Sequence, residues 1–297
     1  MSTHIPAHAS ATPANPVPTR TAVGTAPRPA GPRIQGRQTF LRSVRSEWIK
    51  LWTLQSTWIS SIMTIALSVL FGAGVVISYG QYEHLQGTAK NYITYGLDFG
   101  QIVIAVLAAL VITGEYSSGQ IRSSLTATPQ RGRLLLAKAV VLSVVAFILG
   151  SLSTFLSWAV SKPFIGEYAG SLSDSHYLGR VWGSGLALMG IALMTLGIGF
   201  LVRSTAGSIT FSVVLLFVIA IPLQIMSLKL KWAGKILGCL PSTVAEAVYN
   251  PFHQGTEWGS TTDPTQFLTH GQAIAVFAAW ALIPLIVAWF VFSRRDA

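Results

Sequence analysis

Six long apolar stretches, almost free of charged side chains, run through the sequence and restrict its fold more than any other feature. A segment that crosses a bilayer must satisfy its own backbone hydrogen bonds, and about 20 apolar residues in a helix are long enough to do so. We therefore predict an all-α membrane protein with six transmembrane helices. The expected spans are residues 57–79, 99–114, 134–160, 181–202, 207–226 and 272–292.

The second stretch is the shortest, with sixteen uncharged residues between Asp98 and Glu115. About 17 residues is the lower limit for spanning, so a re-entrant segment is the alternative. We expect a span whose two acids lie near the membrane interfaces.

The composition favours a membrane protein over one that binds nucleic acid. Only 10% of the residues are charged, against about 25% in soluble domains, and the mean hydropathy is +0.55. The net charge of +10 comes from bases that flank the apolar stretches, as insertion topology demands. We expect membrane lipid, and no nucleic acid, among the partners. The single Cys239 excludes an internal disulfide and any cysteine-based metal cluster.

Residues 1–37 differ in character from the rest of the chain. They hold seven of the fourteen prolines, many Ala and Thr, no acid and no apolar run. Such a segment cannot bury enough apolar surface to offset the entropy lost on ordering. We predict a disordered cytoplasmic tail over residues 1–37 and a six-span transmembrane domain over residues 38–297.

Residues 39–55 have the pattern of a basic amphipathic helix. Apolar residues including Trp48 recur at helical spacing, whereas Arg45, Glu47 and Lys50 lie off that stripe. A helix of this kind lies in the plane of the membrane interface. We predict an N-terminal interfacial helix with these four residues as its functional candidates. The alternative is a simple cytoplasmic extension of the first span.

Only residues 203–206 separate the fourth span from the fifth, which predicts an antiparallel hairpin. The fourth span also carries a stripe of small residues, which lets another helix approach closely. We expect that neighbour to belong to the same chain, and a second copy of the chain is the alternative. The stripe repeats every seven residues and comprises Gly183, Gly190, Gly197 and Ser204.

The region around the end of the fifth span mixes apolar and basic residues. Pro222 should kink or end the fifth helix, since its ring clashes with the preceding turn. In residues 227–271 three lysines interrupt the apolar positions. We predict short helices at the outer leaflet before the last span.

The basic residues are distributed unevenly between the two sides of this topology. If the tail is cytoplasmic, fourteen of the twenty lie on the cytoplasmic side. Such a bias is typical of cytoplasmic loops. We therefore expect a multi-pass protein of the plasma membrane with both termini in the cytoplasm.

The polar residues 114–133, between the second and third spans, are the best candidate for a docking site. Ile121 and Leu125 lie one turn apart on one face of a short helix, and Thr128-Pro129 has the pattern of a cap that begins the third span. A short helix across the membrane surface can move the two spans that it joins if a partner pushes it. A tether whose charges only set the topology is an equally good explanation at this point.

The sequence has none of the residue patterns that we would expect of an enzyme or an ion-coupled carrier. None of the six stretches has an acid or a histidine near its middle, where proton or ion coupling needs one. Neither a His-Glu-x-x-His pair for zinc nor a Gly-x-x-x-x-Gly-Lys-Ser/Thr loop for phosphates occurs. We therefore expect no catalytic residue, no metal site and no cofactor on this chain.

Two segments resemble a known family, the ABC-2 type transporter permeases. The entry Arg-Ser-Glu-Trp-Ile-Lys-Leu-Trp-Thr-Leu at residues 45–54 is similar to the amphipathic entry helix of actinobacterial members. The resemblance covers about residues 38–295 and leaves the tail outside. The second segment resembles the first cytoplasmic loop of these permeases and comprises Glu115-x-x-x-Gly119, Ile121, Leu125, Thr128-Pro129-x-Arg131 and Lys138.

The resemblance implies a function and a set of partners. In that family the loop carries a coupling helix that docks on a separate ATP-binding subunit, and two permeases usually pair with two ATPases to export a substrate. It implies a permease homodimer here, with ATP and magnesium on the partner subunit. We expect Glu115 to anchor the loop and Arg122 to face the ATPase. The implied coupling residues are Glu115, Gly119, Ile121, Arg122, Leu125, Pro129 and Arg131.

Two other classes of function stay open alongside an ATP-driven exporter. One is a secondary transporter driven by an ion gradient, and the other is a membrane anchor that transports nothing. The sequence leaves the substrate open among drugs, antibiotics, lipids and peptides.

Overall fold

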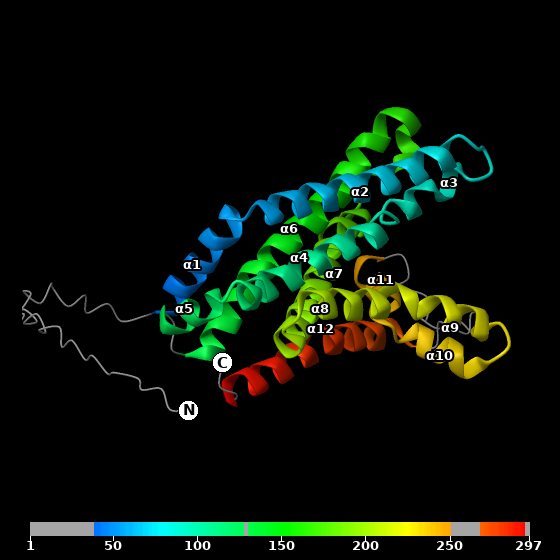
Figure 1. The fold of residues 1–297 in the computed structure, drawn as a ribbon. Helices are drawn as coiled ribbons and strands as arrows, with labels where there is room; N and C mark the ends of the chain where they lie inside the picture. The colour runs from blue at the N-terminus through cyan, green and yellow to red at the C-terminus, as the bar shows by residue number, and fades with distance from the viewer. Residues whose placement is uncertain (1–38, 128–129, 251–267, 295–297) are drawn as a thin grey trace, which may run out of the picture. The chain divides into compact units, whose positions relative to one another are not determined.

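The computed structural model describes residues 39–127, 130–250 and 268–294, and these residues form helices with no strand among them (Figure 1). The tail over residues 1–37 lies outside the described residues, so its predicted disorder stays a prediction. The part described here belongs to one compact unit that begins at Gln38.

Six helical segments of the described chain are long and apolar enough to cross a membrane by length and composition. The structure thus confirms the all-α fold with six candidate spans. The fifth span is divided into three pieces, as described below. The six segments are α2 (Gln55–Gly80), α4 (Leu97–Ser117), α6 (Arg131–Ile165), α7 (Ser175–Val202), α8 to α9 (Thr205–Ser227) and α12 (His270–Arg294).

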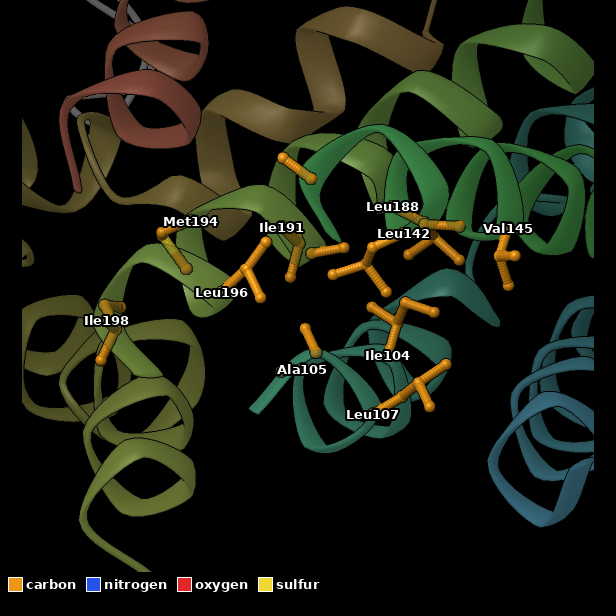
Figure 2. Packing of buried hydrophobic residues seen from close by; sticks show 14 of the residues in the cluster. Ile104, Ala105, Leu107, Leu142, Val145, Leu188, Ile191, Met194, Leu196 and Ile198 are labelled. Carbon is orange, nitrogen blue, oxygen red and sulfur yellow. The ribbon is translucent and has the colours of Figure 1, made fainter. Parts of the chain in front are cut away.

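Helix α7 forms the centre of the unit and is the most buried span. It packs most extensively against α6, then against α12 and α4. Figure 2 shows Ile104 of α4 close to Leu142 of α6, with Leu188 and Ile191 of α7 beside them. All four side chains are at most 1% exposed. This layer fixes α4 and α6 to the same central helix.

The glycine stripe of α7 lies against other helices of the same chain. A Cβ at Gly183 would lie 2.6 Å from the carbonyl oxygen of Val248, and one at Gly197 would lie 2.6 Å from the amide nitrogen of Leu285 in α12. Gly190 meets the ring of Phe277, also in α12. This confirms packing within the chain. It leaves the three glycines unavailable for contact with a second copy.

The fifth span is broken just before Pro222. Helix α8 (Thr205–Val213) runs into a π-helical turn, η3 (Val214–Val218), and α9 (Ala220–Ser227) then continues the span. Since proline clashes with the carbonyl four residues earlier, the regular ladder cannot pass through Val218, and the π-turn absorbs the mismatch. The amide of Ile219 bonds to the carbonyl of Val214 at 3.0 Å. The predicted interruption of this helix is confirmed.

Short helices lie at both ends of the spans (Figure 1). At one end lie α1 (Phe40–Thr53) and α5 (Gln120–Ala127). The opposite end carries the helices that were predicted before the last span, α10 and α11, and residues 251–267 after them lie outside the described residues. The short helices of this second end are α3 (Gln86–Ala89), η1 (Lys90–Tyr92), η2 (Gly166–Ala169), α10 (Lys231–Gly238) and α11 (Pro241–Tyr249).

The connection between α7 and α8 lies at the end of the spans that carries α5, and the chain reverses direction there. Arg203 has a positive φ of 55° there, and its guanidinium lies 5.5 Å from the centre of the Tyr116 ring. The hydroxyl of Thr205 donates to that of Thr113 at 2.9 Å, which ties α8 to the end of α4. The tight hairpin expected from residues 203–206 is present.

Replacement of Gly197 by alanine tests the close approach of α7 to α12. The new methyl group would press on the backbone of Pro284 and Leu285, and over-packing of this kind destabilises by about 1–3 kcal/mol. We expect a lower thermal unfolding midpoint of the purified protein in detergent. Gly74→Ala in α2 is the matched control, since nothing lies within 4 Å of its added methyl group. Equal midpoints for the two variants would contradict the packing described.

Candidate functional site

Helix α5 crosses between the end of α4 and the start of α6, and it is held by one face. Gly119 precedes it with a φ of 71°, a left-handed conformation that glycine adopts without strain. Ile121 is buried at 6% exposure, and Leu125 packs against the same core cluster. Ser124 is also buried. The short helix predicted from the spacing of Ile121 and Leu125 is therefore present.

The opposite face of α5 is open. Arg122, Ser123 and Thr126 are exposed. The hydroxyls of Ser123 and Thr126 bond to backbone carbonyls of their own helix, at 2.8 Å each. Arg122 is therefore the charged side chain that this face presents.

A cluster of four charged side chains, which we call the ion network, lies beneath α5. It joins Glu47 and Lys50 of α1, Glu115 of α4 and Lys138 of α6. Lys138 Nζ lies 2.7 Å from Glu47 Oε2 and 2.8 Å from Glu115 Oε1. Lys50 Nζ lies 2.7 Å from Glu47 Oε1 and 3.1 Å from Glu115 Oε1. Each lysine thus bridges the same two carboxylates.

The ion network also holds α5. Lys50 Nζ lies 3.0 Å from Ser124 Oγ, the buried hydroxyl of α5. One ammonium group therefore contacts α1, α4 and α5 at once. The network connects three helices of this end directly to the start of the third span.

Burial makes the balance of charge in this network important. The side chains of Lys138, Glu47 and Glu115 are 2%, 6% and 7% exposed, and that of Lys50 is 29% exposed. Buried charges are strongly destabilising when one partner is missing, because an uncompensated ion then stays away from water. Two acids and two bases give no net charge here. The four residues are therefore expected to act as a unit.

Two opposing effects act on the pKa of Lys50, the most exposed member of the network: burial and its contacts with the two acids. Burial acts to lower its pKa, but its bonds to Glu47 and Glu115 outweigh this effect, and the pKa is raised above the usual 10.5. A raised lysine pKa contributes stability that is present at neutral pH and is lost only as the pH rises through the folded-state pKa. Lys50 is therefore charged under physiological conditions.

Helix α1 differs from the sequence-based interpretation in the face that it buries. Ser43, Glu47 and Leu51 are its buried residues, whereas the apolar Leu41 on another face is 77% exposed. Glu47, which lies off the apolar stripe, is buried because Lys138 provides a buried partner for its carboxylate. Trp48 is half-buried, and Arg45 is exposed.

A tryptophan cluster marks the junction of α1 with α2. The ring centres of Trp48 and Trp52 are 5.8 Å apart, and those of Trp52 and Trp58 are 4.8 Å apart. Tryptophan is enriched where a membrane meets water. The cluster therefore fits a helix that lies at the interface beside the first span.

Sequence reasoning found most of the parts of this site but not how they connect. It placed Glu115 and Lys138 in one loop, and it assigned Glu47 and Lys50 to a separate interfacial helix. Glu47 and Lys138 are 91 positions apart, so no local pattern links them. Arg131 begins α6 and is half-buried. Pro129 lies outside the described residues.

The described residues hold no group of three or more side chains suited to a metal ion. Both lysines of the ion network bind Oε1 of Glu115, whereas Oε2 of the same carboxylate is buried without a hydrogen-bond partner. The ion network joins α1, α4, α5 and α6 at one end of the spans.

Comparison with known proteins gives one clear match. The family model described as ABC-2 family transporter protein matches residues 45–297, which include α5, the ion network and all six spans. No curated protein matches the chain.

Replacement of Lys138 by methionine should be the most damaging change to the ion network. It leaves Glu47 and Glu115 buried with only the half-exposed Lys50 between them, and breaking a buried pair in this way costs about 3–5 kcal/mol. We expect a large fall in the thermal unfolding midpoint. Lys50→Met is the matched control, with a smaller fall, because this side chain is more exposed.

A second substitution checks that charge balance causes the loss. Adding Glu115→Gln to Lys138→Met removes one of the two acids that then share Lys50 alone, so part of the lost stability should return. Strictly additive losses in the double variant would mean that the four residues do not act as a unit.

Proposed function

We propose that this chain, which belongs to the ABC-2 transporter family, is the membrane subunit of an ATP-driven exporter and that α5 receives the movement of its ATPase partner. The family establishes the coarser part of this statement. The chain is a multi-pass transporter subunit without ATPase activity or a cofactor of its own, and its family implies an ATPase partner. Export, the docking site and the number of copies are our proposals.

The observation that carries the proposal is the two-faced environment of α5. One face is fixed to the core by Ile121 and Leu125 and to the ion network by Ser124. The other face presents Arg122 outward. A partner that docks on the open face can displace α5 only together with α1 and the ends of α4 and α6. A loop that served only as a tether would not need such fixation.

Charge supports a cytoplasmic position for this end. Arg42, Arg45, Lys50, Arg122 and Arg131 all belong to α1, α5 or the start of α6. Cytoplasmic segments carry an excess of Lys and Arg. We place α5 and both termini in the cytoplasm, where ATP is available. The cargo would then leave toward the end that carries α10 and α11.

The exposed faces of the peripheral spans support a complex of two copies. Large apolar side chains such as Phe211, Ile221 and Ile225 are 55–65% exposed along α8 and α9. Lipid can cover such a face, but so can the same face of a second copy. We propose two permease chains and two ATPases, with the substrate path between the permeases.

Arg122→Ala should weaken the ATPase complex while leaving the fold intact. Exposed arginines at the centre of an interface can contribute 2 kcal/mol or more, so we expect at least about tenfold weaker binding of the ATPase. The measurements are co-purification in mild detergent and the ATP hydrolysis rate of the complex in proteoliposomes. Arg45→Ala removes an exposed base from α1 at the same end and should leave both unchanged.

Two results would contradict this proposal. If Arg122→Ala and Arg45→Ala behave alike, α5 is not the specific docking element. If the purified chain alone moves its cargo under a proton or sodium gradient, without regard to ATP, it acts as a secondary transporter.

The orientation can be tested with the single Cys239. This residue follows α10 at the end opposite α5, so a membrane-impermeant maleimide should label it in intact cells. Burial raises the pKa of the Cys239 thiol. Because the thiolate reacts, the labelling rate should rise as the pH is raised from 7 toward 8.5.

A second cysteine position provides the control for orientation. In a Cys239→Ser background, Ser123→Cys places the thiol on the open face of α5 and should be labelled only after the cells are permeabilised. The reverse pattern for the two positions would mean that the protein is inserted the other way round.

A further inference from the structure

A polar cavity of about 570 Å³ lies at the end opposite α5. It is bounded by the residues that lead into α4 and by α11, and no member of the ion network lines it. Its chemistry is set by two carboxylates and three aromatic rings. These belong to Asp98, Glu246, Tyr92, Tyr95 and Tyr249. The coupling mechanism proposed above makes no use of this cavity.

The two carboxylates have no positive partner within the cavity. Asp98 and Glu246 are close enough to interact electrostatically, and neither forms an ion pair within the described part of the chain. Asp98 accepts one long hydrogen bond of 3.4 Å from Gln101, and Glu246 accepts one of 3.2 Å from Asn250. Of the described residues that line the cavity, none is basic.

A buried arginine, Arg180, forms hydrogen bonds with residues that line the cavity. Arg180 of α7 is 1% exposed, and its guanidinium donates to the carbonyl of Asn91 at 2.6 Å and to the side chain of Asn250 at 2.8 Å. It thereby joins both sides of the cavity from behind. Arg180 interacts electrostatically with Glu246, so two carboxylates and one buried base lie at this cavity.

The aromatic residues add a second feature that favours a cation. Tyr92 and Tyr95 are at least one-third exposed, so their rings are accessible to a ligand, and a cation over such a ring is attracted to its face. Burial, followed by the charges of Asp98 and Glu246, raises the pKa of Tyr249 well above 10. Tyr249 therefore stays a neutral phenol and adds no further negative charge.

We propose that this cavity recognises a monovalent organic cation with an aromatic or apolar body, and that this ligand is the cargo. The cavity volume is in the range of sites for small molecules. A divalent metal fits less well, because calcium takes six to eight oxygen ligands and the described residues offer no cluster of three acids. The assignment as cargo rests on the proposed function, whereas binding itself does not.

Ethidium is a suitable probe, since it is a fluorescent aromatic monocation. We would titrate it into the purified full chain in nanodiscs. Asp98→Asn and Glu246→Gln should each weaken its binding about tenfold, as expected when a charged partner is removed from a partly buried site. Glu167→Gln is the matched control, since this exposed acid of η2 lies at the same end but outside the cavity.

The aromatic contribution has its own pair of variants. Tyr95→Leu should weaken ethidium binding about threefold, and Tyr95→Phe should leave it unchanged, because the ring is what attracts the cation. If Asp98→Asn destabilises the fold and so lowers the unfolding midpoint, its binding result is set aside. The variants Glu246→Gln, Tyr95→Leu and Tyr95→Phe then show whether the cavity binds ethidium. Binding that does not respond to Glu246→Gln or Tyr95→Leu would overturn the site.

A transport measurement separates this inference from the proposal on coupling. With the ATPase present, ATP-driven movement of ethidium that Glu246→Gln reduces would support its assignment as cargo. Binding that depends on the two acids, without any such movement in a complex that hydrolyses ATP, would overturn the cargo assignment. Failure of the ATPase to co-purify would instead contradict the coupling proposal and leave the binding result standing.

Discussion

The pairing of Lys138 with Glu47 and Glu115 is the interaction on which the α5 end of this protein depends. Three of the four side chains in the ion network are less than one-tenth exposed. Removing the partner of any of them would leave a buried charge uncompensated and would strongly destabilise the fold. These ion pairs determine where α1 lies, because its Glu47 and Lys50 must reach Lys138 of α6 and Glu115 of α4. The short helix α5 is then fixed through Ser124 and two apolar residues.

Close packing in the spans provides the rigid body that such a network needs. Helix α7 is in contact with α4, α6, α11 and α12, and its glycines bring the backbones of α11 and α12 within touching distance. Between membrane helices the attraction comes from such close contact, because lipid is as apolar as the side chains. A displacement of α4 or α6 at the α5 end therefore acts on a packed core. The same core leads to the cavity at the other end.

The two ends differ in how their charges are satisfied. At the α5 end two acids and two bases lie together, whereas at the α11 end Arg180 interacts electrostatically with Glu246 from behind the cavity wall, and Asp98 forms no ion pair within the described residues. A network in which each lysine bridges the same two carboxylates suits the mechanical role that we propose for this end. An unsaturated, solvent-accessible pair beside tyrosine rings suits recognition of a cation. This contrast supports the different tasks that we propose for the two ends of the chain.

The sequence by itself determined the six spans, the helix after Gly119, the break before Pro222 and the family, because hydrophobic length, turn residues and short motifs are local properties. The tertiary structure alone decided that Glu47 is buried, because its partner Lys138 is 91 positions away. It likewise turned the glycines of the stripe toward α11 and α12, and it brought Asp98 of α4 near Glu246 of α11, which lies far along the sequence. Contacts between distant segments depend on how helices pack, and a one-dimensional pattern carries no record of that packing.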